Sequence, residues 1–536
     1  MSKKILLFFL LYSCCIVAQE DAWVYFNDKP NAQTFLDNPL SMLTQRALDR
    51  RMNQGIALDI TDAPVEQSYF DNVATATGIV VKAKSRWLNC LHVRGSISDI
   101  QALTALPFVH HIRFANNALN AKTSASYSTS VVNKQMETAA NFNYGNSSNQ
   151  IQMLNAHLLH QADYTGNGKI IAVLDSGFIG VDTVVPFNRL FANGLYLGGY
   201  NYVAGNTNVF TAHNHGTMTL SCMVGYVDGQ LVGTAPDAQY YLFVTEDVAG
   251  ENPVEESYWV QAAEEADRLG VDVISSSLGY FEYDNPTYSY TYSDMTGNLA
   301  FASQGANLAF SKGMIVVASA GNSGAGAEPH VGVPGEATNV FAVGAVKADR
   351  AYASFSSIGP SYDGRIKPDV MAQGENAAIA TITGDITTAN GTSFSCPIMA
   401  GAITSLWQAI PWATNVQVLD FVKQSADRFT LPDAQYGYGI PNFQIALAIA
   451  SLEVNENTKN SFVIYPNPMA SQLMVSFPTN IHEVEIELYN AIGQKVFSKT
   501  MQNANAPITI DQLSTGIYYY KIQGGALVQT GKIIKQ

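Results

Sequence analysis

The chain is poor in cysteine and in charged side chains. Five cysteines occur in 536 residues, so a network of disulfides does not hold the fold together. Charged residues make up only 14% of the chain, and 44 acidic residues outnumber 29 basic ones. The resulting net charge of −15 repels phosphate backbones and argues against nucleic acid as a partner. A hydrophobic content of 47% nevertheless indicates a folded chain.

Long hydrophobic runs are also scarce. The apolar run at residues 5–18 is too short to cross a bilayer comfortably, and it lies between two lysines and a polar segment. This pattern predicts a secretory signal peptide over residues 1–18, cleaved near Ala18. A retained membrane anchor and a lipoprotein signal at Cys14 or Cys15 are the alternatives. The polar segment that follows and the Leu-Tyr-Ser before Cys14 fit these alternatives poorly.

The pattern of apolar and polar residues changes twice along the rest of the chain. Several domains are expected, because a chain of this length is too long for one hydrophobic core. Residues 19–120 mix apolar strands with two helical stretches, one with Asn38 or Ser41 as its N-cap and one opened by Ser98 and Asp99. They predict an α+β domain. Residues 121–150 are rich in Ser, Asn, Thr and Ala without apolar periodicity, which indicates a linker and a processing site.

Residues 151–452 and 460–536 predict two further domains. In the first, short runs rich in Val and Ile alternate with helical stretches, which favours an α/β fold with a mainly parallel sheet flanked by helices. In the second, a Tyr-Pro-Asn-Pro turn precedes short, closely spaced strands, which favour a small β-sandwich.

Four segments of residues 151–452 carry the groups that serine-nucleophile acyl transfer requires. Asp175 ends an apolar strand, His215 precedes a helix of small residues, Asn322 follows a buried strand, and Ser393 opens an apolar helix. A serine hydroxyl needs a base, the base needs an orienting acid, and the oxyanion needs a donor. Taken singly, the four fit an Asp turn cap, a structural histidine, an ordinary turn and a helix N-cap. Together they indicate one catalytic site.

Three cysteines remain after removal of the signal peptide. Cys222 lies seven residues after His215, and Cys396 lies three after Ser393. If both segments begin helices that meet under the site, these two cysteines come close enough for a disulfide. The alternative is that both are small buried side chains.

Residues 150–450 resemble the subtilisin-like serine proteases, the subtilase family, on the segments around Asp175, His215, Asn322 and Ser393. The resemblance implies that Asp175 orients His215, that His215 is the general base, that Ser393 attacks, and that Asn322 with the Ser393 N–H binds the oxyanion. Two departures from the family pattern, Ser-Gly-Phe after Asp175 and Phe-Ser-Cys after Ser393, remove no catalytic group.

The same resemblance assigns the substrate-binding segments. It implies that Ser277, Leu278 and Gly279 pair with an extended substrate, and that Gly332 forms the base of a pocket for large apolar or aromatic side chains. The tyrosine-rich insert at residues 280–295 either shapes the cleft or forms a structural flap. Members of the family need no cofactor for the chemistry. A structural calcium ion is compatible with the resemblance, and its ligands are not assigned.

The flanking domains complete the expected function. Residues 19–120 resemble the inhibitory propeptide of related subtilases, and residues 460–536 resemble the C-terminal sorting domain of type IX secretion cargo. We therefore expect a secreted or surface-located serine endopeptidase. Its expected partners are protein or peptide substrates, its own propeptide and the type IX machinery. The alternatives are a catalytically silent surface-binding protein, an esterase or aminopeptidase with the same triad, an accessory N-terminal domain, and a ligand-binding β-sandwich.

Overall fold

The computed structural model describes residues 19–120, 142–459, 462–476, 481, 483–490, 492–502, 506–525 and 527–536. The chain forms two compact units that divide between Leu447 and Ala448. The predicted signal peptide and most of the predicted linker lie outside the described residues. Among the helices that are described, none is both long and apolar enough to cross a bilayer.

The N-terminal part of the first unit is an α+β domain, as predicted. Its four antiparallel strands pair in the order β2-β3-β1-β4. The elements are β1 Glu20–Phe26, α1 Ala32–Leu36, α2 Gln45–Asn53, α3 Gln67–Ala74, β2 Val80–Ser85, β3 Cys90–Gly95, α4 Ile97–Ala102 and β4 Val109–Phe114. One face of the sheet packs against α3 and α4 through a core that includes Val24, Val73, Leu91, Ile100 and Phe114.

The two helix starts predicted in this domain are wrong by a few residues. Residues Pro39–Ser41 form a separate 3₁₀ turn, and α2 begins only after Thr44, whose hydroxyl accepts a hydrogen bond from the Ala47 N–H at 3.3 Å. Helix α4 begins after Ser96, whose hydroxyl accepts a hydrogen bond from the Asp99 N–H at 3.1 Å. Each hydroxyl satisfies an amide of the first turn that has no partner within the helix.

A seven-stranded sheet forms the centre of the first unit. All of its neighbouring strands are parallel, in the order β13-β12-β11-β10-β5-β9-β6. The strands are β5 Ile170–Asp175, β6 Tyr196–Asn201, β9 Gln239–Val244, β10 Val273–Ser276, β11 Ile315–Ser319, β12 Phe341–Val346 and β13 Val370–Gln373. Five of them, β5 and β10 to β13, are buried along their whole length, as expected of strands covered on both faces. The predicted α/β fold is confirmed.

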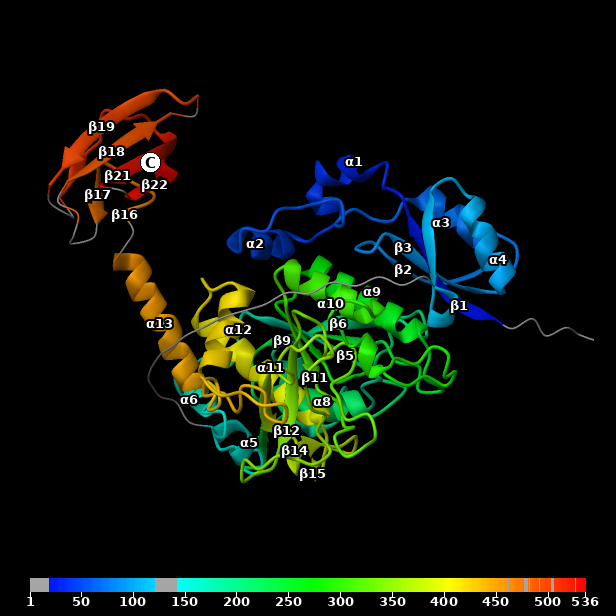
Figure 1. Ribbon diagram of the computed structural model, residues 1–536. Coiled ribbons are helices and arrows are strands. Elements are labelled where there is room, and N and C mark those ends of the chain that lie inside the picture. The colour runs from blue at the N-terminus through cyan, green and yellow to red at the C-terminus, as the bar shows by residue number, and fades with distance from the viewer. Residues whose placement is uncertain are drawn as a thin grey trace, which may run out of the picture. The chain divides into compact units, whose positions relative to one another are not determined.

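Helices lie on both sides of this sheet (Figure 1). On one side, α9 Val254–Leu269 and α10 Phe301–Ser311 pack through Trp259 and Ala302 onto Leu174 and Val316 of the strands. On the other, α8 His215–Val224 and α11 Thr392–Ala409 contact each other. The remaining described α-helices and strands of the central part are α5 Ser148–Gln152, α6 His157–Gln161, α7 Asn188–Ala192, β7 Tyr226–Val227, β8 Leu231–Val232, β14 Ala377–Ala380, β15 Ile386–Ala389, α12 Asn415–Gln424 and α13 Phe443–Lys459.

The second unit is a small β-sandwich, as predicted. Its two antiparallel sheets have the strand orders β16-β17-β20 and β19-β18-β21-β22. The strands are β16 Val463–Tyr465, β17 Gln472–Ser476, β18 Val484–Tyr489, β19 Lys495–Met501, β20 Ile508–Thr509, β21 Gly516–Gly524 and β22 Leu527–Lys535. One core joins the two sheets, with Leu473 and Val475 from the first and Ile486, Ile522 and Ile533 from the second.

A buried histidine of α6, His160, shares a backbone hydrogen-bond acceptor with α11, the helix that carries Ser393. His160 Nε2 donates to the Thr234 carbonyl at 3.0 Å, so its Nδ1 accepts from the Tyr144 hydroxyl at 2.9 Å. The same carbonyl accepts a hydrogen bond from Ser405 of α11 at 2.9 Å. Burial lowers the pKa of His160 to about 4. The imidazole is therefore neutral in the folded chain at neutral pH.

This arrangement predicts a loss of stability in mild acid. The unfolded chain takes up the proton of His160 below about pH 6.5, whereas the folded chain resists it until about pH 4. The contribution of His160 is therefore present at pH 7 and falls by on the order of 3 kcal/mol between these values. We expect His160→Gln to show a smaller fall in unfolding midpoint between pH 7 and pH 5. Thermal unfolding in a Ser393→Ala background measures it, with the exposed His110→Gln as control. Equal pH slopes in all variants would contradict the assignment.

Candidate active site

The predicted catalytic groups gather at the carboxyl-terminal edge of the parallel sheet, where folds of this type bind their ligands. Asp175 is the last residue of β5, and Asn322 lies in the loop just after β11. His215 is the first residue of α8, and Ser393 is the second residue of α11. Each functional side chain is therefore attached to the end of a packed, regular element or lies close to one.

Asp175 and His215 form a direct pair. Asp175 Oδ1 and His215 Nδ1 are 2.7 Å apart, and the aspartate is completely buried. Its carboxylate also accepts hydrogen bonds from the Ser176 N–H at 2.8 Å and from the Thr219 hydroxyl at 3.0 Å. The Ser176 hydroxyl adds a fourth donor at 3.2 Å. The bond of the carboxylate to Nδ1 orients the imidazole and leaves Nε2 facing away from Asp175.

The charge of Asp175 also sets the protonation of His215. Burial alone lowers the pKa of His215, but the charge of Asp175 and its hydrogen bond raise it more, and Glu246 adds to the rise. The net effect places the pKa of His215 above its usual value of 6.5. A proton taken up at Nε2 is therefore stabilised by the carboxylate behind the ring.

Ser393 and Asn322 are linked through Thr392. Asn322 Oδ1 accepts hydrogen bonds from the Thr392 N–H at 2.9 Å and from the Thr392 hydroxyl at 3.0 Å. With Oδ1 held in this way, the Nδ2 donors of the exposed Asn322 side chain face the opposite direction. The bonds of the described residues include none between His215 and Ser393, and the Phe394 ring lies 6.3 Å from the imidazole, centroid to centroid. Catalytic hydrogen bonds are often long before substrate binds.

The predicted substrate-binding segments lie side by side. Tyr280 N–H donates to the Val333 carbonyl at 2.8 Å, which joins the segment after Gly279 to the segment after Gly332. Leu278 is half-buried and Gly279 is exposed. A Cβ on Gly332 would meet the Phe281 ring and the Tyr280 carbonyl at 3.5 Å, which is ordinary van der Waals contact.

Ser277 and two tyrosines of the tyrosine-rich insert are buried and form hydrogen bonds within the protein. The Ser277 hydroxyl is buried and donates to the Ser393 carbonyl at 2.9 Å. In the insert, Tyr283 and Tyr290 are buried and donate to Glu256 Oε1 of α9 at 2.7 Å and 2.6 Å. These two tyrosines therefore belong to the core, which favours the structural alternative for this part of the insert.

Comparison with known families identifies the central domain. Residues 166–439, half of the chain, match the family model described as "Subtilase family". The chain belongs to the subtilase family. Residues 21–131 match "Peptidase S8 propeptide domain, Bacteroidota", and residues 463–536 match "Secretion system C-terminal sorting domain". The predicted architecture of this subtilase is confirmed, and its sorting domain directs export by the type IX system to the cell surface or the medium.

Individual relatives agree with the family. Subtilisin NAT of Bacillus subtilis subsp. natto is 31% identical over 299 residues, which cover 55% of this chain and 70% of the relative. Subtilisin of Bacillus pumilus is 30% identical over 299 residues, which cover 55% of this chain and 97% of the relative. The epidermin leader peptide processing serine protease (EpiP) of Staphylococcus aureus shares the fold, with a TM-score of 0.52 and 16% identity over 80% of this chain and 98% of that one. The subtilase described here is a subtilisin-like serine peptidase.

Two hydrogen-bonding residues of the subtilase site were not predicted from the sequence. Thr219, which binds Asp175, lies four residues after His215 on α8, so helical spacing could have placed it on the same face. Thr392 directly precedes Ser393, but its bonds to Asn322 join residues 70 positions apart and have no local signal.

The remaining candidates near the site have other roles. His213, in the loop before α8, is exposed, and its Nδ1 accepts a hydrogen bond from the His215 N–H at 3.3 Å. Cys222 and Cys396 are buried, free thiols, so the alternative without a disulfide holds. Among the described residues, no three His, Cys, Asp or Glu side chains gather as a metal site. The calcium ion stays a prediction.

Proposed function

We propose that this subtilase is a secreted endopeptidase that hydrolyses peptide bonds through an acyl-enzyme on Ser393. The observation that carries the proposal is the buried Asp175–His215 pair, 2.7 Å long, at the sheet edge where α11 begins with Ser393. In the proposed mechanism, His215 Nε2 takes the proton of the Ser393 hydroxyl as Oγ bonds to the scissile carbonyl carbon. The carbonyl π electrons move onto its oxygen.

The proton then moves forward with the leaving group. The imidazolium of His215, stabilised by the carboxylate of Asp175, donates its proton to the amine nitrogen as the carbon–nitrogen bond breaks. A water molecule next attacks the Ser393 ester, again giving its proton to His215 Nε2. The carbon–Oγ bond breaks, and the proton returns to the serine. The products are a carboxylic acid and an amine, and no external electron carrier takes part.

Asn322 and the start of α11 supply the proposed oxyanion site. The Nδ2 donors of Asn322 are free to bind the oxygen because Oδ1 is occupied by Thr392. The Ser393 N–H lies in the first turn of α11, where amides lack intrahelical acceptors and the helix dipole favours negative charge. Removal of one such donor typically lowers the rate by about 10²–10³.

Leu278, Gly279 and Gly332 supply the proposed substrate contacts. The exposed backbone at Gly279 is available for an extended peptide to pair with as an added strand. Gly332 lies beside the ring of Phe281, which offers an apolar surface next to the glycine for a substrate side chain to contact. We therefore propose that the enzyme prefers an aromatic or large apolar residue before the scissile bond.

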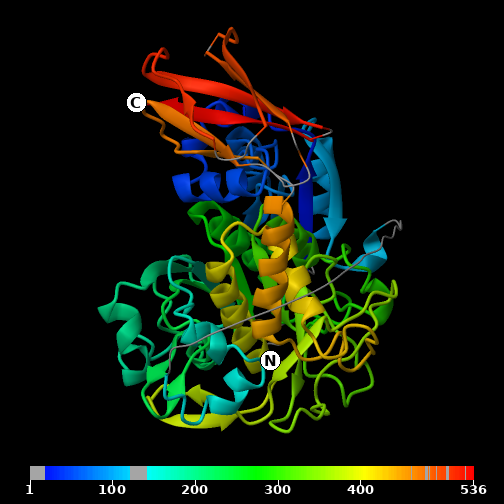
Figure 2. The same ribbon diagram turned by 90° about the vertical axis from the view of Figure 1, so that its left-hand side faces the viewer.

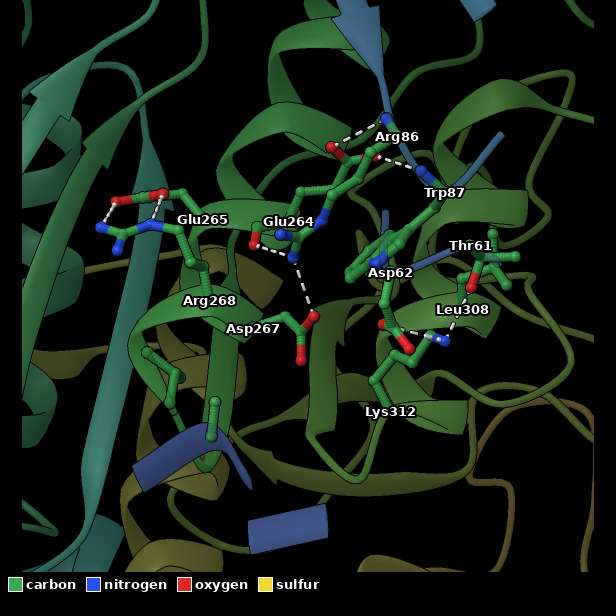
Figure 3. Close-up of polar contacts among 12 residues, drawn as sticks. Thr61, Asp62, Arg86, Trp87, Glu264, Glu265, Asp267, Arg268, Leu308 and Lys312 are labelled. Atoms are coloured by element: carbon green, nitrogen blue, oxygen red, sulfur yellow. Dashed lines mark hydrogen bonds and ion pairs between the residues drawn. The ribbon is translucent and has the colours of Figure 1, made fainter. Parts of the chain in front are cut away.

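We further propose that the N-terminal domain inhibits the enzyme by remaining docked on α9 and α10. The domain lies over these helices in both views (Figures 1 and 2). Asp267 of α9 is completely buried and binds three arginines of this domain, Arg50 at 2.6 Å, Arg51 at 2.7 Å and Arg86 at 2.9 Å. Figure 3 shows part of this cluster.

Two further residues, Glu264 and Lys312, extend the docking surface, and Figure 3 shows their contacts with Trp87 and Asp62. Glu264, one turn before Asp267, accepts hydrogen bonds from the Ser85 hydroxyl at 2.6 Å and the Trp87 N–H at 3.0 Å. In the opposite sense, the catalytic domain supplies a positive charge at Lys312, just after α10. Lys312 binds Asp59 at 3.1 Å and Asp62 at 3.2 Å in the N-terminal domain. Complementary charges thus run in both directions, which fixes the register of the two surfaces.

Covalent labelling tests the proposed chemistry. A serine-reactive phosphonate should add one adduct to the chain, and peptide mapping should place it on Ser393. Ser393→Ala should remain unlabelled while retaining its unfolding temperature. If Ser393 is labelled and the enzyme cleaves esters or N-terminal residues but no internal peptide bonds, the result would favour the esterase or aminopeptidase alternative. No adduct on a folded chain would contradict the mechanism and favour the binding protein.

A further inference from the structure

A proline interrupts the hydrogen bonding of the helix that begins at Ser393. Pro397 lies inside α11, four residues after Ser393. In an α-helix the N–H of residue i+4 donates to the carbonyl of residue i, and proline has no N–H. The proline ring also crowds the carbonyl four residues earlier and tilts it away from the helix axis. The Ser393 carbonyl therefore lacks its normal donor.

A side chain from outside the helix supplies the missing donor. Ser277 directly follows β10, and its hydroxyl donates to the Ser393 carbonyl at 2.9 Å. Both residues are buried, with exposed fractions of 7% for Ser277 and 8% for Ser393. A buried carbonyl without a donor is unfavourable, so the bond holds the Ser393 peptide in one orientation.

Neighbouring contacts leave the first turns of α11 little freedom to shift. Cys396 Sγ lies 3.5 Å from the Ser276 carbonyl and 3.5 Å from the Val317 carbonyl, in β10 and β11. The Ser277 hydroxyl fixes the direction of the Ser393 carbonyl and therefore the ψ torsion of Ser393. Rotation about it displaces the Ser393 Oγ and N–H relative to His215 and Asn322.

We propose that Ser277 is a positioning residue for the nucleophile, made necessary by Pro397. The proposal rests on the proposed role of Ser393. It assigns the Ser277 side chain to the enzyme's own α11, a role in addition to the pairing with substrate predicted for this segment from the sequence. It also makes the importance of Ser277 conditional, because an N–H at position 397 would offer the Ser393 carbonyl a donor within the helix.

A double-mutant cycle in the full chain tests this dependence. We expect Ser277→Ala to lower kcat about tenfold with KM nearly unchanged, since a slightly misplaced nucleophile reacts slowly but binds substrate normally. Ser277→Thr retains the hydroxyl and should retain most of kcat. In a Pro397→Ala background, the additional loss caused by Ser277→Ala should shrink to about twofold.

A matched variant in the same helix controls for general loosening of α11. Ser405 is buried and also donates its hydroxyl to a backbone carbonyl, that of Thr234, at 2.9 Å, but it lies more than three turns from Ser393. Ser405→Ala should lower the unfolding temperature while leaving kcat unchanged. A fall in kcat equal to that of Ser277→Ala would contradict the proposal.

Two further outcomes would overturn the inference. A rise in KM at constant kcat for Ser277→Ala would assign the hydroxyl to substrate binding. Equal losses from Ser277→Ala in the wild-type chain and in the Pro397→Ala background would show that the proline does not create the need for Ser277. Phosphonate labelling of the wild-type chain distinguishes a failure of this inference from a failure of the proposed function. An unlabelled Ser393 contradicts the proposed function, whatever the Ser277 variants show.

Discussion

Asp175→Asn is expected to lower kcat for peptide hydrolysis by about 10⁴-fold while leaving KM and the fold nearly unchanged. The physical reason lies in the 2.7 Å contact between Asp175 Oδ1 and His215 Nδ1. Ser176 N–H donates to this same Oδ1, whereas the Thr219 hydroxyl donates to Oδ2, so the single oxygen of asparagine keeps the Thr219 bond when it takes the place of Oδ2. The amide nitrogen then faces Nδ1, which forces the proton onto Nε2 and leaves His215 unable to act as the base.

The pH profile provides a second readout for Asp175. His215 acts as a base only when neutral, and Asp175 raises its pKa, so the activity of the wild type should rise with pH through a value above 6.5. Loss of the carboxylate should move this acid limb of the residual activity to lower pH. The exposed Asp182→Asn is a control that should change neither kcat nor the acid limb. An unchanged kcat in Asp175→Asn would contradict the proposed triad.

Asp267→Asn is expected to free the N-terminal domain after processing. Burial alone raises the pKa of Asp267, but Arg50, Arg51 and Arg86 outweigh it and hold the pKa below its usual value. The carboxylate therefore contributes docking free energy at every pH above about 4, and this contribution is lost only as pH falls below that range. Its removal leaves Arg50 and Arg86 without a carboxylate partner, while Arg51 keeps Asp62 at 2.8 Å; loss of one partner of a buried ion pair costs roughly 3–5 kcal/mol.

Size-exclusion chromatography with intact mass analysis measures this effect on the self-processed enzyme. The wild-type N-terminal fragment should co-elute with the catalytic fragment, and casein hydrolysis should show a lag. In Asp267→Asn the fragments should elute separately and the lag should disappear; co-elution as in the wild type would contradict the docking role. Arg86→Ala, which leaves two of the three arginines, should give a smaller effect. Glu265→Gln is the matched control, because Glu265 lies on the same helix but pairs with Arg268 of the catalytic domain.

Local patterns in the sequence were sufficient for the fold and for placing Asp175, His215 and Ser393 at the ends of its strands and helices. Strands without alternation, such as β5, predicted a sheet covered on both faces. The placement of Asp175 at a strand end, and of His215 and Ser393 at helix starts, follows from the residues on either side of them. The burial of a strand and the place of a residue at the end of an element depend on neighbouring residues in the chain. The composition and spacing of those residues can therefore predict them.

Contacts between distant segments could not be predicted in the same way. Ser277 and Ser393 are 116 positions apart, and Asp267 and Arg50 are 217 apart. No pattern along the chain reports which way these side chains point, because tertiary packing decides it. The start of α2 was missed for a related reason. Several residues there can cap a helix, and the separate turn at Pro39–Ser41 leaves Thr44 as the N-cap.

The most direct measurement compares the purified wild-type chain with Ser393→Ala by intact mass, with casein present. We expect the wild type to lose an N-terminal fragment ending between residues 115 and 150 and to degrade casein, whereas Ser393→Ala stays full-length and leaves casein intact. Identical behaviour of the two proteins, whether both process or neither does, would contradict the proposal that Ser393 is the nucleophile.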